Sequence, residues 1–437
     1  MEQTKVAIIG MGTVGSGVAK LLLDHGDRTA RHAGRTLWLE KVVVRDIAKV
    51  RDCDLPANVL TNKLKDVTSN PEIKVVAQLI GGLEPARTIM RTLLESGKDV
   101  VTANKALLAE HGPELFDLAR ELGRSIAFEA SVAGGVPIIT NISQCLSANQ
   151  ITSLRGILNG TSNFIVSQME QGADYAEAVR EAQERGYAEA DPTMDVDGTD
   201  AAQKLAILAH LAFGARVHWS EIPRVGIDTL QTADLTFAAE LGYRIKLLAV
   251  ARLADGCSPA GGLDLHVSPT LVKAGTPLAE VRGANNAISV HGDAVGNVFF
   301  HGLGAGQMPT ASAVVADLID TCVGRTRLTF QTLQLWSQEE ALVQPRDFDL
   351  VPARYYVRLM VDDDPGVLAA VAGVLGEHRI SIASVIQHEP EDAETSKRVA
   401  LVIMTHTAPE GAIAKAVTAI DRLKQVSGGT VRMRVLD

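Results

Sequence analysis

The sequence has few aromatic residues, few cysteines and no long apolar run, and each shortage argues against a class of protein. Aromatic residues make up 4%, and the four cysteines form no CxxC pair, so neither a disulfide framework nor a zinc site is expected. No uninterrupted apolar run approaches the roughly 20 residues that span a bilayer. The first apolar segment begins at Lys5 without a charged and apolar leader before it, so we expect a cytoplasmic protein without a membrane anchor.

Basic residues are also in the minority. There are 42 Lys and Arg against 52 Asp and Glu, which gives a formal net charge of -10, and no long basic run occurs. Nucleic acids and anionic membranes are therefore not expected partners. A chain of 437 residues that is 46% hydrophobic and 22% charged is expected to form two or three well-packed globular domains.

Short apolar segments alternate with helical patterns through the first 130 residues. Lys5–Gly10 has the pattern of a buried strand, and a helical pattern follows over Thr13–Leu23. Further strand patterns lie at Leu37–Val44, Val75–Ile80, Asp99–Thr102 and Ser125–Phe128. This order predicts an α/β fold with a Rossmann-type, doubly wound parallel sheet in residues 1–130, completed by about residues 308–345.

A glycine-rich turn joins the first strand to the first helix. It reads GMGTVG and fits the pattern GxGxxG, in which the glycines permit a tight turn, close approach to a pyrophosphate and close strand–helix packing. Alone, the motif often marks only a tight turn, but here it has the required strand before it and helix after it. We therefore predict a nicotinamide-dependent oxidoreductase. Its dinucleotide would be bound at Gly10, Gly12, Thr13, Val14 and Gly15.

The end of the second strand bears on the choice of cofactor. Asp46 suits the ribose hydroxyls of NAD, whereas Arg45 suits the 2′-phosphate of NADP. A solvent-exposed loop of mixed charge is the alternative. We favour NADP and leave NAD open.

Two segments place polar side chains among small residues. Lys105 follows a strand, at the edge of an α/β sheet where ligands bind, although a surface lysine is the alternative. The run Tyr187–Lys204 holds five carboxylates within twelve residues and continues into an Ala-rich helix. Asp200 and Lys204 share one face of that helix, where a surface ion pair is the alternative. We expect Lys204 to act as a general acid/base.

The rest of the chain divides by pattern into three parts. Residues 131–307 mix helical and strand patterns and predict an α+β domain. Residues 346–353, framed by prolines, predict a linker. Residues 354–437 show a βαββα order, which predicts a compact ferredoxin-like module.

These motifs resemble those of homoserine dehydrogenase in its long form, which carries a C-terminal ACT domain. The matching segments are the glycine turn, Ala103–Lys105, Phe128–Pro137, Leu158–Asn163, Tyr187–Lys204, Gly302–Gly306 and Pro309–Ala313. The resemblance implies reversible, NAD(P)-dependent reduction of L-aspartate 4-semialdehyde to L-homoserine, a step of threonine, methionine and isoleucine biosynthesis. One departure is Leu303, where the family usually has proline, which leaves the cofactor geometry at that loop open.

The resemblance also implies roles for individual residues. Lys204 matches the catalytic proton donor, Lys105 matches a lysine beside cofactor and substrate, and Gly304 lies on the cofactor side. The substrate-binding residues of the family match Glu189, Asp195 and Asp200. The backbone oxygens implied for a monovalent cation, Na⁺ or K⁺, are those of Glu129, Val132, Gly134 and Val136.

The C-terminal module carries a further implication of the resemblance. The segment Tyr355–Leu368 resembles the opening of an ACT domain, with Gly366 at the first strand–helix turn, and implies L-threonine as effector and feedback inhibitor. A homodimer or higher homo-oligomer is implied as well, with residues 131–307 as the domain for substrate binding, catalysis and dimerisation. The alternatives are another NAD(P)-dependent amino-acid or hydroxy-acid dehydrogenase and a non-catalytic amino-acid sensor. The first calls for a His–Asp or His–Glu pair that is not recognisable here, and the second has no need of both Lys105 and Lys204.

Overall fold

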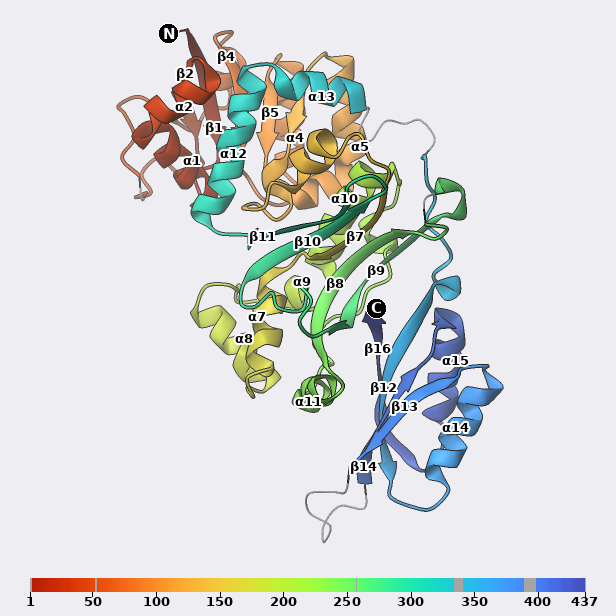
Figure 1. Ribbon diagram of the computed structural model, residues 1–437. Coiled ribbons are helices and arrows are strands. Elements are labelled where there is room, and N and C mark those ends of the chain that lie inside the picture. The colour runs from red at the N-terminus through yellow and green to blue at the C-terminus, as the bar shows by residue number, and fades with distance from the viewer. Residues whose placement is uncertain (1, 52, 257, 334–340, 389–397, 437) are drawn as a thin grey trace. The chain divides into compact units, whose positions relative to one another are not determined.

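The computed structural model describes residues 2–51, 53–256, 258–333, 341–388 and 398–436 (Figure 1). Its internal contacts divide the chain into two compact units. The first unit comprises Met1–Leu154, Asp200–Ile222 and Asn285–Gln344, and the second comprises Arg155–Thr199, Pro223–Ala284 and Pro345–Asp437. Within the described part of the chain, no helix is both long and apolar enough to cross a membrane.

A six-stranded parallel sheet forms the centre of the first unit. Its strands follow the order β3-β2-β1-β4-β5-β6, so the strand order reverses between β1 and β4, as in a dinucleotide-binding sheet. The strands are β1 (Gln3–Ile9), β2 (Thr36–Val43), β3 (Leu60–Thr61), β4 (Ile73–Gln78), β5 (Asp99–Thr102) and β6 (Ile126–Ala127). This arrangement confirms the predicted Rossmann-type fold.

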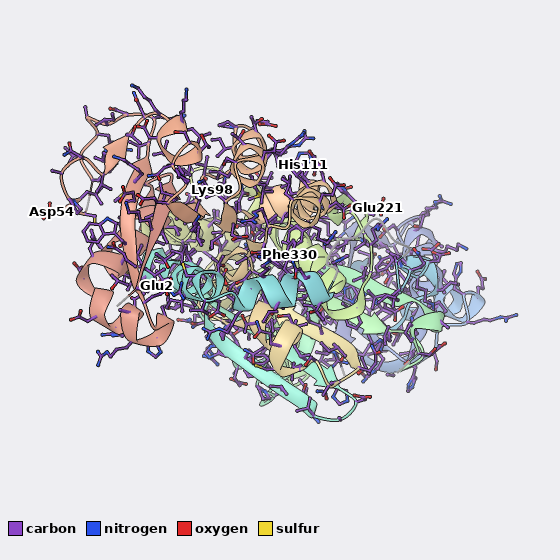
Figure 2. The ribbon with its side chains drawn as sticks, turned by 90° about the horizontal axis from the view of Figure 1, so that it is seen from above. Glu2, Asp54, Lys98, His111, Glu221 and Phe330 are labelled. Atoms are coloured by element: carbon purple, nitrogen blue, oxygen red, sulfur yellow. The ribbon has the colours of Figure 1, made fainter. Side chains whose placement is uncertain are left out.

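Helices pack against this sheet, including one from late in the chain. Helix α12 runs beside α1 (Figure 1), and the two are so close that a Cβ atom on Gly17 would lie 2.9 Å from that of Ala311. Phe330 of α13, labelled in Figure 2, is buried with its ring 5.2 Å from that of Phe116. The helices of this part are α1 (Thr13–Asp24), α2 (Gly26–Ala33), α3 (Lys65–Thr68), α4 (Ala86–Glu95), α5 (Lys105–Glu121), α12 (Gln307–Cys322) and α13 (Arg325–Leu333).

The first unit also contains elements that the sequence patterns do not predict. The antiparallel hairpin of β10 (Asn285–Gly292) and β11 (Gly296–Leu303) leads directly into α12. Most residues of β11 are only partly buried or exposed, so its sequence does not show the regular alternation of apolar and polar residues that predicts a strand. The short helix α6 (Ile138–Thr140) also lies here, and strand β7 (Ile151–Ile157) is divided between the units after Leu154. Helix α10 (Thr199–Phe213), which the sequence pattern does predict, belongs to the first unit from Asp200 onward.

The second unit is built on long strands. Strands β8 (Tyr243–Leu253) and β9 (Leu263–Lys273) form an antiparallel hairpin, and β9 pairs in parallel with β16 (Val426–Leu436). Strand β16 is also a member of the C-terminal module, so one sheet continues from the hairpin into that module (Figure 1). The helices outside the module are α7 (Gly160–Met169), α8 (Tyr175–Glu184), α9 (Thr193–Val196) and α11 (Thr232–Glu240).

The C-terminal module has the predicted ferredoxin-like fold with two strands more than expected, the two-residue β15 and the long β16. Helices α14 and α15 cover one face of its sheet (Figure 1), and their apolar side chains form one core with those of β12 and β14. The predicted order βαββα was incomplete, because β16 follows α15 and pairs with β12. The elements are β12 (Pro352–Asp362), α14 (Val367–Glu377), β13 (Ile382–Gln387), β14 (Arg398–Thr405), β15 (Ala408–Pro409) and α15 (Glu410–Ile420).

A buried ion pair attaches the module to α11. The Arg358 guanidinium on β12 donates from Nε and Nη2 to the two carboxylate oxygens of Asp234, at 2.6 and 3.0 Å. The Tyr356 hydroxyl also donates to Asp234, at 3.1 Å. Asp234 is fully buried, so its charge depends on these partners.

Candidate active site

The glycine turn has the geometry that a bound pyrophosphate needs. Gly10 has φ +96°, which favours glycine, and a Cβ atom on Gly15 would lie 2.2 Å from the Gly10 carbonyl oxygen. Gly12 precedes the first residue of α1, Thr13, and no atom lies within 4 Å of the position of its missing Cβ. The backbone therefore leaves open space at a helix N-terminus, which fits a phosphate group.

The loop after β2 presents Arg45 to solvent. The neighbouring carboxylate of Asp46 accepts a hydrogen bond from the backbone N–H of Ala48 at 2.8 Å, and Arg51 donates to the Asp46 carbonyl oxygen. Asp46 is thus partly used in holding the loop, whereas the Arg45 guanidinium is exposed beside the strand end.

Lys105 is held at the first residue of α5 by the residue before it. The side-chain oxygen of Asn104 caps the helix by accepting from Leu107 N–H at 3.1 Å. The side-chain nitrogen of Asn104 donates to the carbonyl oxygens of Ile80 and Gly82, at 3.0 and 2.7 Å. These bonds tie the end of β5 to the loop after β4, at the edge of the sheet where ligands of Rossmann-type folds bind.

The two lysines singled out in the sequence meet at one carboxylate. Lys105 Nζ lies 3.0 Å from Oδ1 of Asp200, and Lys204 Nζ lies 2.7 Å from Oδ2. Asp200 stands in the first turn of α10, and its side chain is 7% exposed, against 12% for Lys204 and 35% for Lys105. The prediction that Asp200 and Lys204 share a helix face is confirmed. The pairing of Asp200 with Lys105 was not predicted.

This arrangement brings the ammonium groups of Lys105 and Lys204 together around one largely buried carboxylate. Each ammonium group is a cation with N–H donors and directs one of them toward Asp200. Two ammonium groups at one place can stabilise negative charge that develops on an oxygen atom. Asp200 offers both carboxylate oxygens to the lysines, so its carboxylate orients the two ammonium groups in addition to any contact with substrate.

In the second unit, the segment after α8 is held by the motif at the start of α7. Asn159 Nδ2 donates to Asp195 Oδ1 at 2.7 Å, and the Ser162 hydroxyl donates to the Asp195 carbonyl oxygen at 2.6 Å. The Thr161 hydroxyl donates to the Tyr187 carbonyl oxygen at 2.7 Å. The motif Leu158–Asn163 therefore positions the carboxylate-rich segment, which explains why both occur in this chain.

Glu189 lies on that segment with its side chain exposed. Its backbone carbonyl oxygen accepts from Gln183 Nε2 at 3.2 Å, which fixes the main chain and leaves the carboxylate directed to solvent. Within each unit, then, the structure groups Lys105, Asp200 and Lys204 in the first, and places Glu189 and Asp195 on one segment of the second.

The loop expected to hold a cation is packed against the loop expected to approach the cofactor. Gly134 N–H donates to the Gly304 carbonyl oxygen at 2.8 Å, and Gly135 N–H donates to the Leu303 carbonyl oxygen at 3.0 Å. Leu303 keeps this pairing without a proline, and its side chain is 53% exposed. The Val136 carbonyl oxygen accepts from Ile138 N–H at 2.7 Å.

The Glu129 side chain supports this loop from within. Its carboxylate accepts from the backbone N–H groups of Ile139 and Thr140, at 2.9 and 2.8 Å, and its own backbone N–H donates to Asp317 at 2.8 Å. Burial raises the pKa of both the Glu129 and the Asp317 carboxyl groups, despite these hydrogen bonds.

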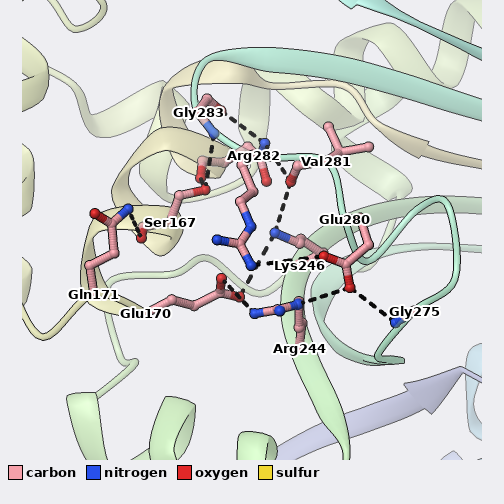
Figure 3. Close-up of polar contacts among 11 residues, drawn as sticks. Ser167, Glu170, Gln171, Arg244, Lys246, Gly275, Glu280, Val281, Arg282 and Gly283 are labelled. Carbon is pink, nitrogen blue, oxygen red and sulfur yellow. Dashed lines mark hydrogen bonds and ion pairs between the residues drawn. The ribbon is translucent and has the colours of Figure 1, made fainter.

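The sequence patterns did not single out one lysine that the structure shows to be buried. Lys246 lies in β8, fully buried, and its Nζ donates to the Val281 carbonyl oxygen at 2.9 Å and lies 3.8 Å from Glu170 (Figure 3). Burial lowers the pKa of Lys246. Asn163 donates to the carbonyl oxygens of Val281 and Gly283, so both side chains hold the turn before β10. A lysine inside the apolar pattern of a strand was the feature of the sequence that could have indicated its burial.

A histidine on α10 makes the active-site helix sensitive to acid. Burial, together with the nearby Arg216 and Arg120 side chains, lowers the pKa of His210 from 6.5 to about 4, and its Nδ1 lies 3.1 Å from the Ala215 carbonyl oxygen. Because folding favours the neutral ring, the contribution of His210 to the free energy of unfolding is fully present above pH 6.5. This contribution is lost as the pH falls toward 4. The loss due to His210 is about 2 kcal/mol at pH 5.

Urea unfolding at pH 7 and pH 5 checks this expectation. His210→Gln is expected to lose about 2 kcal/mol less than the unmodified chain between the two pH values. His32→Gln, which alters an exposed histidine of α2, is the matched control and is expected to behave as the unmodified chain. An unchanged pH dependence in His210→Gln contradicts the assignment.

Comparison with known proteins agrees with the residue-level geometry. Family models described as "Homoserine dehydrogenase, NAD binding domain", "Homoserine dehydrogenase" and "ACT domain" match residues 10–129, 137–319 and 355–424. Homoserine dehydrogenase of Pseudomonas aeruginosa is 45% identical over 442 residues, which cover 100% of this chain and 99% of that protein. The crystal structure of a homoserine dehydrogenase from Thiobacillus denitrificans is 41% identical, covers 100% of this chain and 99% of its own, and has a TM-score of 0.90.

A more distant structure carries a cofactor. A hyperthermophilic archaeal homoserine dehydrogenase mutant in complex with NADPH is 25% identical, has a TM-score of 0.60, and covers 73% of this chain and 97% of its own. The three family matches follow one another along the chain, and the relative from P. aeruginosa extends over all of it. The chain therefore belongs to the homoserine dehydrogenase family, whose members are NAD(P)-dependent oxidoreductases that interconvert L-aspartate 4-semialdehyde and L-homoserine.

Proposed function

We propose that Lys204 donates the proton in the reduction of L-aspartate 4-semialdehyde, with Lys105 beside it and Asp200 orienting both. The observation that carries this proposal is the pair of contacts at Asp200, 3.0 Å to Lys105 and 2.7 Å to Lys204. Bound NAD(P)H supplies the hydride. As negative charge develops on the carbonyl oxygen, an ammonium group held within hydrogen-bond reach both stabilises that charge and gives up its proton.

Carboxylates bind the other end of the substrate in this proposal. Glu189, Asp195 and Asp200 supply negative charge for the substrate ammonium group through charge-assisted hydrogen bonds. The exposure of Glu189 and the anchoring of Asp195 by Asn159 support these roles. Oxidation of L-homoserine, followed through the absorbance of NADPH, tests the reaction, and a chain that turns over another hydroxy acid faster contradicts it.

NADP is the preferred cofactor in this proposal, and exposed Arg45 binds its 2′-phosphate. Arg45→Ala is expected to raise KM for NADP⁺ about 10- to 100-fold, because one charge-assisted hydrogen bond is lost, and to leave KM for NAD⁺ unchanged. Arg28→Ala, at an exposed arginine of α2, is the matched control. An equal change of both KM values in Arg45→Ala shows that this residue does not read the 2′-phosphate.

The C-terminal module binds L-threonine in this proposal. Gly366 has φ +94°, precedes α14, and has no atom within 4 Å of the position of its missing Cβ, so an amino acid can approach the backbone there. Titration calorimetry of the full chain is expected to give a saturable heat with L-threonine and none with D-threonine. No heat with L-threonine at millimolar concentration rejects the effector.

The remaining parts of the proposal rest on the family resemblance. A monovalent cation, Na⁺ or K⁺, binds the backbone oxygens of the loop from Glu129 to Val136, whose main chain is fixed by the pairing with Leu303 and Gly304. The domain limits are residues 1–130 with about 308–345, then 131–307, and 354–437 after a linker at 346–353. The enzyme acts in the cytoplasm as a homodimer or higher homo-oligomer.

A further inference from the structure

The second unit contains a pocket lined by arginines, and none of its lining residues is among those proposed for catalysis. Its lining includes Arg155, Arg252, Arg354 and Arg434, which we call the arginine pocket. Asp264 is the only carboxylate among the described residues of this lining. The pocket has a volume of about 220 Å³, which exceeds that of a few water molecules.

Strand pairing places several of these groups on one face of the sheet. Arg252 of β8 is directly opposite Asp264 of β9, and Arg434 of β16 is directly opposite Thr270 of β9. Residues opposite one another, and residues two apart along one strand, project from the same face. The pocket therefore lies where the β8–β9 hairpin meets the C-terminal module, with strands β9, β16 and β12 side by side (Figure 1).

The carboxylates nearby are already shared between arginines. Asp264 accepts from Arg252 through Oδ2 at 2.9 Å, whereas its buried Oδ1 lies 3.7 Å from Arg346 and has no hydrogen-bond donor among the described residues. Glu410 lies 2.7 Å from Arg432 and is also bonded by Arg434. Each of these two acids thus serves two guanidinium groups, so positive charge at this place exceeds negative charge among the described residues.

Arg155 adds a second, independent observation. Its Nε atom is buried and has no hydrogen-bond partner among the described residues, although a buried N–H donor normally has one. Arg252, which faces the same pocket, is 40% exposed on its side chain, so the pocket opens to solvent. A buried N–H donor without an acceptor, next to a solvent-accessible cluster of guanidinium groups, is an arrangement that suits the binding of an oxyanion.

We propose that the arginine pocket binds a small oxyanion, carried by a carboxylate or phosphate metabolite. Arg155 and Arg252 contact it from β7 and β8, and Arg354 and Arg434 contact it from β12 and β16 of the C-terminal module. Such an anion joins the two parts of the second unit, so its binding stabilises their junction. This site is distinct from the turn at Gly366 proposed for threonine.

Titration calorimetry of the full chain tests the site with two probes, inorganic phosphate and succinate. NADP⁺ is present at a concentration just sufficient to fill the cofactor site, and ionic strength is held constant. A saturable heat with either probe at one site per chain is expected, and the probe that binds identifies a phosphate or a carboxylate as the ligand group. No saturable heat with either probe at millimolar concentration overturns the proposal.

Arg155→Gln is expected to weaken the binding about tenfold or more, because a charge-assisted donor is lost. Arg180→Gln, at an exposed arginine of α8, is the matched control and is expected to bind the anion as the unmodified chain does. Unchanged turnover of homoserine by Arg155→Gln shows that the variant is folded, and Arg252→Gln replaces it if it is not. Equal affinity in the folded arginine-pocket variant and the control overturns the proposal.

The same experiment also detects two other possible occupants of the arginine pocket. Asp437 lies outside the described residues and directly follows Leu436 of the pocket lining. If the anion binds only to Asp437→Asn, the side-chain carboxylate of Asp437 competes for the pocket in the unmodified chain and the proposal is overturned. It is also overturned if neither anion binds and Arg155→Gln changes the oligomeric state in sedimentation, because the pocket is then a contact between copies of the chain.

Discussion

Lys204→Ala is expected to lower kcat for homoserine oxidation about 100- to 10,000-fold, the range in which a positioned acid or base contributes. The side chain removed is the ammonium group 2.7 Å from Asp200, only 12% exposed, on the first turns of α10. Without it, no proton leaves or reaches the substrate oxygen through this group, whereas the glycine turn at Gly10–Gly15 is untouched. Cofactor affinity, measured by fluorescence titration with NADPH, is therefore expected to stay unchanged.

Two further variants separate proton transfer from charge and from general damage. Lys204→Arg keeps the positive charge but cannot give up a proton near neutral pH, so it is expected to remain nearly as slow as Lys204→Ala. Lys65→Ala removes an exposed lysine of α3 and is expected to have normal kcat. Near-normal turnover by folded Lys204→Ala means that another group transfers the proton.

The second large effect concerns stability. Asp234→Ala is expected to lower the free energy of unfolding by about 3–5 kcal/mol, because Arg358 is left buried without its charge partner. Both side chains are nearly inaccessible, at 4% exposure for Arg358 and 0% for Asp234, so water cannot replace the lost contact. Urea unfolding monitored by circular dichroism measures the change.

A double variant shows whether Asp234→Ala loses stability because a charge is left unpaired or because a cavity forms. Asp234→Leu combined with Arg358→Met removes both charges and is expected to be more stable than Asp234→Ala, since no ion remains buried without a partner. If the double variant is at least as unstable as Asp234→Ala, packing at this place matters more than the ion pair.

Much of the first unit could be predicted because its pattern is local. Strands β1, β4 and β5 are short apolar runs that end at glycine or polar residues, and the turn at Gly10 stands between a strand and a helix. Strand β3 has only two residues, which is too short for a pattern, and was not predicted. The shared face of Asp200 and Lys204 follows from the periodicity of one helix. No local rule relates Lys105 to Asp200, which are far apart in the sequence and are brought together by the positions of α5 and α10.

Strand β16 shows why the C-terminal module was read incompletely. Gly428 and Gly429 interrupt its first half, so only Val431–Val435 shows the alternation of apolar and polar residues that is typical of a strand, and this short pattern was overlooked. The polar positions of that pattern are Arg432 and Arg434, and both contact the buried carboxylate of Glu410. The pairing of these arginines with Glu410 joins separate elements, so no local pattern predicts it.

The most direct test of the account is a crystal structure of this chain with NADP⁺ and L-homoserine. The distance from Lys204 Nζ to the substrate hydroxyl oxygen is the measurement that decides the proposed mechanism. We expect a distance within hydrogen-bond reach, about 2.6–3.2 Å, with Asp200 still bonded to both lysines. A hydroxyl group beyond the reach of Lys204, with another proton donor in contact with it, contradicts the account.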